Sequence, residues 1–164
     1  MILGMSLATY TIVHVIISLI GIGSGLIVLF GLLNGKLLGP WNSLFLVTTV
    51  LTSVTGFFFP FEKITPGIIL GILSLIVLAI AILALYAFHL RGPWRTTYVI
   101  TAMLALYFNM FVLVAQLFMK VPAIHALAPT QTEAPFKIAQ LLLLLIFIIA
   151  IITAARKFRH TLPA

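Results

Sequence analysis

Few side chains in this sequence are suited to chemistry. The 164 residues include four histidines, two acids and no cysteine. The lack of cysteine excludes disulfides, thiolate catalysis, zinc–thiolate sites and iron–sulfur clusters. The sequence also contains no nucleophile–base–acid set, no phosphate-binding loop and no pair of carboxylates inside an apolar run. We therefore assign no catalytic residues and expect a protein that is not an enzyme.

Two histidines and the two acids are the strongest candidates for binding a metal or a cofactor. Imidazole ligates metals and haem, although a buried histidine more commonly bonds to a neighbouring side chain or carbonyl. A haem held by two histidines needs both at one depth, so His14 qualifies only with His125 and not with His89. A metal site of His14 and His125 with Glu62 or Glu133 has suitable ligand types, without the close spacing typical of such sites. Such a site remains an alternative interpretation.

The elements that position these residues are expected to be membrane helices. The chain is 63% apolar and 7% charged, with a mean hydropathy of +1.33. Soluble domains have about 25% charged residues, and a helix needs about 20 apolar residues to cross a bilayer. The sequence predicts an all-α single domain over residues 1–164, a bundle of five transmembrane helices. Their approximate ranges are 10–33, 42–59, 66–90, 96–119 and 136–155.

Lysine and arginine in the loops indicate how such a bundle is oriented, because cytoplasmic loops carry an excess of both. One side has six of these residues and the other has three. The six are Lys36, Arg91, Arg95, Arg156, Lys157 and Arg159; the three are Lys63, Lys120 and Lys137. We expect the N-terminus outside and the C-terminus in the cytoplasm. The basic residues form no continuous face, so nucleic acid is not an expected partner.

Polar residues inside membrane helices usually face other helices, because lipid offers them no hydrogen-bond partner. In the first helix His14, Ser18, Gly21 and Gly25 share one face at helical spacing. Combining such faces with depth predicts a polar pocket open to the outside. The candidate ligand-binding residues are His14, Thr55, Glu62, Asn109, Gln116, His125, Gln131, Glu133 and Gln140.

The segment 121–136, "VPAIHALAPTQTEAPF", is the longest stretch unlike a membrane span. It is long for a connection between two packed helices, where 2–8 residues are usual. Its apolar residues argue against a freely solvated linker, and "KVPAIHAL" is suited to a short helical turn. We expect this segment to cover the polar end of the bundle.

Three stretches carry a resemblance to a known group of proteins: "TTVLTSVTGFFFPFE", "YFNMFVLVAQLFMKVP" and "HALAPTQTEAPFKIAQ". From about Ser6 to Gln140 the chain resembles a family of small inner-membrane proteins of bacteria to which no activity is assigned. The resemblance implies a helical bundle in the bacterial cytoplasmic membrane and carries over no site residues. The opening "HVIISLIGIGSG" is similar, more loosely, to multispan domains suspected of redox roles.

The leading functional hypothesis is a membrane protein that binds a small ligand or lipid in the outward pocket, or serves as a small subunit of a larger membrane complex. A homo-oligomer is compatible with both. The first alternative is a redox protein that holds haem, quinone or metal through His14 and His125. The second is a small channel or transporter. No cofactor is favoured.

Overall fold

The computed structural model describes residues 1–161, and in this part of the chain the regular structure is helical. Five helices are longer than one turn: α1 (Leu7–Leu33), α2 (Gly39–Gly56), α3 (Pro66–Ile82), α4 (Trp94–Lys120) and α6 (Ala134–Thr161). A π-helical turn η1 (Leu83–Ala87) extends α3, and the one-turn helix α5 (Pro122–His125) lies between α4 and α6. The all-α prediction is confirmed.

Local chemistry explains why several helices begin before the predicted residues. The Ser6 hydroxyl accepts a hydrogen bond from the amide of Thr9 at 3.1 Å, so α1 starts at Leu7 rather than near residue 10. A serine in this position satisfies an amide that the helix itself leaves unpaired. Thr65 performs the same role for α3, with Pro66 in the first turn as predicted. Pro40 lies in the first turn of α2, which begins at Gly39.

The predicted third helix, 66–90, does not continue as an α-helix to its end. The hydrogen bonding changes to π-type at Leu83, and both His89 and Leu90 have positive φ angles, 49° and 56°. This left-handed backbone ends the helix before the segment that leads into α4. An apolar run indicates how far a helix extends in the membrane but not where its backbone changes geometry.

Four helices are long and apolar enough to cross a membrane: Leu7–Leu33, Pro66–Ala87, Trp94–Lys120 and Ala134–Phe158. The described chain is thus that of a multi-pass membrane protein by length and composition. Helix α2 is not among the four. Its 18 residues include Asn42 and six serines and threonines, which make it less apolar than the other four. At about 1.5 Å per residue the helix is about 27 Å long. The five-span count and the orientation of the termini therefore remain predictions, and the side chain of Arg159 lies outside the described part.

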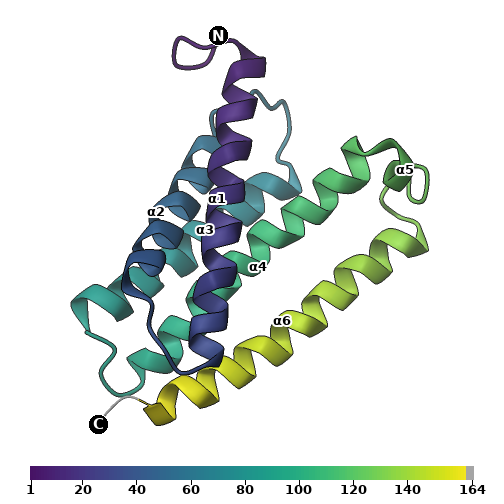
Figure 1. Cartoon of the computed structure of the whole chain (residues 1–164). Coiled ribbons are helices and arrows are strands. Elements are labelled where there is room, and N and C mark those ends of the chain that lie inside the picture. The colour runs from purple at the N-terminus through teal and green to yellow at the C-terminus, as the bar shows by residue number, and fades with distance from the viewer. Residues whose placement is uncertain (162–164) are drawn as a thin grey trace.

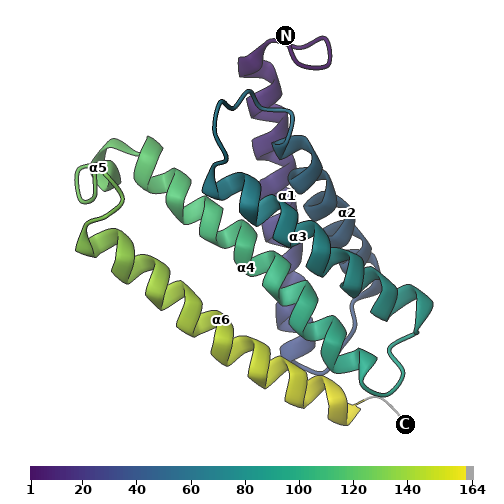
Figure 2. The same ribbon diagram turned by 180° about the vertical axis from the view of Figure 1, so that it is seen from behind.

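Helices α1 to α4 form a ring in which each packs against the next and α4 returns to α1, while α6 lies along α4 and also packs against α1 (Figures 1 and 2). We call the end that holds the chain's N-terminus the N-terminal end of the bundle. The opposite end, where α1 and α6 finish, is the C-terminal end. Towards the N-terminal end α1 and α4 diverge, as both views show.

The apolar core fills the C-terminal half of the ring. Its fully buried side chains include Leu32 of α1, Phe45 of α2, Leu78 of α3 and Tyr98 and Leu106 of α4. The hydroxyl of Tyr98 donates to the buried side-chain oxygen of Asn42 and so links α4 to α2. The N-terminal half has few such residues, which leaves space between its helices.

Gly21 and Gly25 of α1 permit close packing inside the ring. A methyl group added at Gly25 would lie 2.6 Å from Cδ1 of Leu106 and 2.9 Å from the ring of Phe45. At Gly21 it would lie 3.3 Å from the hydroxyl of Thr48. Small residues on a shared helix face allow close approach of a neighbouring helix, and here the neighbours are α2 and α4 of the same chain.

Candidate functional site

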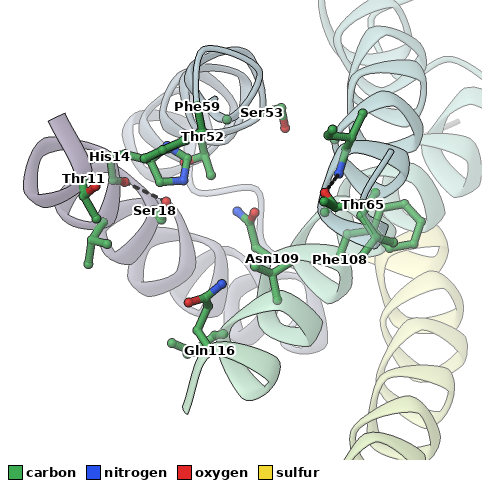
Figure 3. Close-up of a pocket in the computed structure, with 18 of the residues that line it drawn as sticks. Thr11, His14, Ser18, Thr52, Ser53, Phe59, Thr65, Phe108, Asn109 and Gln116 are labelled. Carbon is green, nitrogen blue, oxygen red and sulfur yellow. Dashed lines mark hydrogen bonds between the residues drawn. The ribbon is translucent and has the colours of Figure 1, made fainter. Parts of the chain in front are cut away.

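A cavity of about 710 Å³ occupies the N-terminal half of the ring. It is bounded by the first half of α1, the end of α2, the first half of α3 and the second half of α4 (Figure 3). The segment 57–65, between α2 and α3, closes its N-terminal end with Phe57, Phe59, Pro60 and Phe61. Helix α6 contributes no described residue to the lining.

The cavity is open sideways along α1. Leu7, Val15 and Leu19 line it and are nevertheless 50, 41 and 49% exposed. On the opposite edge Leu117 of α4 also lines the cavity and is exposed. Since α1 and α4 diverge at this end, the opening faces the surroundings of the bundle, which are lipid for membrane helices.

Most lining residues are apolar, and the polar ones are almost all neutral. Among the described lining residues the only charged one is Lys120, an exposed residue in the last turn of α4. The neutral polar groups come from all four helices and from the segment after α2. They are Thr11, His14, Ser18, Thr52, Ser53, Thr65, Ser74, Asn109 and Gln116.

Most hydroxyl groups in these helices bond to their own helix, donating to the carbonyl four residues earlier, a common arrangement where no water is present. Examples from the lining are Thr11 with Leu7 at 2.8 Å, Ser18 with the His14 carbonyl at 2.7 Å, and Thr52 with Thr48 at 2.8 Å.

Ser74 of α3 departs from this pattern. Its side chain is 3% exposed, lines the cavity, and has no hydrogen-bond partner among the described residues. The side-chain nitrogen of Asn109 is likewise buried without a partner, and Figure 3 shows this amide directed between the helices that surround the cavity. Three further side-chain atoms in the described chain are buried and unpaired but do not line the cavity: the hydroxyl of Thr49, Nδ2 of Asn42 and Oε1 of Gln140. Buried polar groups are usually paired, so the two that line the cavity, Ser74 and Asn109, are available to a molecule bound there.

His14 is held by α2 at the side of the cavity. Its Nδ1 lies 2.8 Å from the hydroxyl of Thr55, which itself donates to the carbonyl of Leu51 at 2.6 Å. Because the hydroxyl has one hydrogen and uses it for that carbonyl, the imidazole must be the donor, with its proton on Nδ1. In its neutral form this ring keeps a lone pair on Nε2. Phe59 packs edge-on against the ring at a centroid distance of 5.1 Å.

Three of the predicted binding residues hold α6 and the loop before it to the outside of α4. Nδ1 of His125 lies 3.0 Å from the carbonyl of Phe118, and Nε2 of Gln131 donates to Ala115 at 2.8 Å. Nε2 of Gln140 donates to the carbonyl of Phe111 at 3.1 Å. The three carbonyls are spaced at i, i+4 and i+7, so they follow one side of α4. None of the three side chains lines the cavity.

The two acids lie elsewhere on the surface. Glu62 is exposed in the segment after α2 and is outside the cavity lining. Glu133 accepts a hydrogen bond at 2.8 Å from the hydroxyl of Thr130, which holds the pKa of this carboxyl below its usual value. In the described chain no three histidine, cysteine, aspartate or glutamate residues gather as a possible metal site.

The structure thus brings together part of the predicted set. His14, Asn109 and Gln116 line one cavity, and Thr55 positions His14 from behind. Ser74 was not among the predicted binding residues. The signal that identifies it, a buried hydroxyl without a hydrogen bond to its own helix, depends on a side-chain rotamer and is not visible in sequence.

Comparison of the chain with protein-family models, with curated proteins and with solved structures finds no match.

Proposed function

We propose that this protein binds a small apolar or amphipathic molecule that enters the cavity from the membrane. The observation that carries the proposal is a cavity of about 710 Å³, lined by apolar side chains with a few neutral polar groups and open sideways between α1 and α4. Ligand sites commonly have volumes of about 300–1,000 Å³ and combine an apolar lining with few placed polar groups.

The side opening supports a ligand that is dissolved in lipid rather than in water. The exposed lining residues Leu7, Val15 and Leu19 are apolar and follow α1 along the opening. A water-soluble ion or sugar would find no charged partner until it reached Lys120 at the rim. A molecule with an apolar body can pass this edge without losing hydrogen bonds to water.

The packed C-terminal half of the ring supports binding rather than passage through the bundle. Leu32, Phe45, Leu78, Tyr98 and Leu106 fill that half and are each fully buried. A channel needs a path across the whole membrane, and these packed side chains block such a path.

We further propose that the cavity lies in the outer half of a bacterial cytoplasmic membrane, with α2 as a fifth span. The support is the distribution of lysine and arginine, which are more frequent at the C-terminal end of the bundle. In this orientation the N-terminus is outside, and the ligand comes from the outer leaflet.

The test is identification of what remains bound when the full chain is purified in a mild detergent. Organic extracts of the wild type are compared by mass spectrometry with those of Val112→Trp, which fills the cavity from α4, and of Val13→Trp. Val112 lines the cavity, whereas Val13 is exposed on α1 outside it.

We expect one class of small molecule to be enriched in the wild type and in Val13→Trp and to be lost from Val112→Trp. Equal lipid mixtures in all three preparations would contradict the proposal. A visible haem band or a stoichiometric metal in the wild type would instead favour the redox alternative with His14.

A further inference from the structure

We infer that the ligand of this cavity presents an uncharged hydrogen-bond acceptor, of the carbonyl type, to Asn109 and Ser74. The inference rests on the proposed function and adds the chemical class of the molecule. An apolar cavity that opens into a bilayer can be filled by any hydrocarbon chain. Selection among membrane molecules must therefore come from the polar groups within it.

These groups lie together at the inner end of the cavity. With a rise of about 1.5 Å per residue, Asn109 lies about 16 Å from the end of α4, Ser18 about 16 Å from the start of α1, and Ser74 about 12 Å from the start of α3. All three line the cavity. Ser53 of α2 also lines this region and is buried. We call Ser18, Ser53, Ser74 and Asn109 the polar floor; each of the four helices contributes one residue.

The polar floor has spare donors. The hydroxyls of Ser18 and Ser53 donate to carbonyls of their own helices, at 2.7 and 3.1 Å. Asn109 and Ser74 are different, because the amide nitrogen of the first and the hydroxyl of the second are buried and unpaired. An amide nitrogen can only donate, and a serine hydroxyl can donate one hydrogen. The group that pairs with both is an acceptor, and a carbonyl oxygen accepts two hydrogen bonds.

The acceptor must be uncharged. Apart from Lys120 at the rim, the described lining contains no cationic or acidic side chain. A carboxylate or phosphate at the depth of Asn109 would be removed from water without a countercharge, which is far more costly than burying a neutral carbonyl. The ligand is thus a neutral amphiphile that inserts its carbonyl end first and leaves its apolar body along the opening.

The test uses a matched pair of probes, 2-pentadecanone labelled with ¹³C at the carbonyl and pentadecane, with the full chain in bilayers of diether lipid. Diether lipid has no ester carbonyl to compete. The carbonyl resonance of the ketone reports both binding and hydrogen bonding, and pentadecane is measured by its competition with the ketone.

We expect a bound ketone resonance shifted downfield from that of the ketone in lipid, and a weaker competition by pentadecane. Asn109→Leu or Ser74→Ala should each weaken ketone binding by about tenfold, the net effect of about one hydrogen bond, without changing the affinity for pentadecane. Thr153→Val, which removes a hydroxyl of α6 outside the cavity, should change neither.

Each contrary outcome points to a different error. Equal binding of ketone and alkane, or a ketone preference that survives in both variants, would overturn the inference and leave the cavity as an apolar binding site. Failure of both probes to bind would overturn the proposed function itself. Displacement of the ketone by dioleoylglycerol would identify a glycerolipid ester, rather than a free carbonyl amphiphile, as the natural source of the acceptor.

Discussion

Replacement of Ser74 by alanine should stabilise the ligand-free protein. A buried polar group without a partner costs about 1–3 kcal/mol, and the hydroxyl of Ser74 has none in the described chain. When the bundle comes apart in detergent, α3 stays helical, and this hydroxyl becomes free to bond to the carbonyl of Leu70. Folding therefore removes a hydrogen bond that the unfolded state can make.

The expected magnitude is near the lower end of that range. Side-chain hydrogen bonds in membrane bundles average only about 0.6 kcal/mol, and helix propensity adds nothing because α3 is helical in both states. We expect a gain of about 1 kcal/mol for Ser74→Ala, together with the loss of ketone affinity described above. A variant that is more stable but binds less well is typical of a binding site rather than of a packing position.

Ser24→Ala is the matched control. Ser24 is equally buried, but its hydroxyl donates to the carbonyl of Ile20 in the same helix at 2.7 Å. Because this bond is present both in the bundle and in the separated helix, its loss should change stability by only a few tenths of a kcal/mol. Thermal unfolding in one detergent, followed by near-ultraviolet circular dichroism, which reports side-chain packing rather than helix content, gives both values. If Ser74→Ala is no more stable than Ser24→Ala, Ser74 has a partner and the reasoning fails.

Three further changes test the packing and the loop. Gly25→Ala should destabilise the bundle by about 1–3 kcal/mol, because the methyl group would overlap α4, whereas Gly23→Ala meets nothing within 4 Å and should be neutral or stabilising in the same unfolding assay. Gln131→Leu should speed amide hydrogen exchange in the segment 121–133 by releasing it from α4, and unchanged exchange would refute this role. The pKa of Glu133 is lowered from about 4.5. The stabilisation that its carboxylate gives the turn should therefore be complete above about pH 4.5 and lost as the pH falls through the lowered pKa. Thr130→Val should bring the carboxyl titration, followed by ¹³C NMR, back up towards 4.5.

The helices and their buried faces were predictable because hydropathy and helical spacing depend only on local sequence. The end of α1 at Leu33 and the inward face that carries His14 and Gly21 are examples. Boundaries set by a capping side chain, such as Ser6, were missed because an apolar run does not register them. The π-helical turn after α3 was missed for the same reason.

The composition of the site was only partly predictable, because it depends on how the helices are ordered in space. Gln140 and Gln131 have the depth expected for the cavity, but they lie on the far side of α4, where α6 packs. The depth of a residue along its helix can be counted from the sequence. Which neighbouring helix that residue faces, and on which side, cannot. Ser74 required knowledge of a rotamer as well as of the fold.

The central claim is that a specific molecule occupies the cavity between α1 and α4, and cross-linking in intact membranes tests it most directly. A photoreactive benzoylphenylalanine is placed at Val112, inside the cavity, or at Val13, outside it. After irradiation, mass spectrometry of the full chain identifies what is attached. The account predicts one neutral, carbonyl-bearing amphiphile at Val112 and the bulk lipid mixture at Val13; the same bulk mixture at both positions would contradict it.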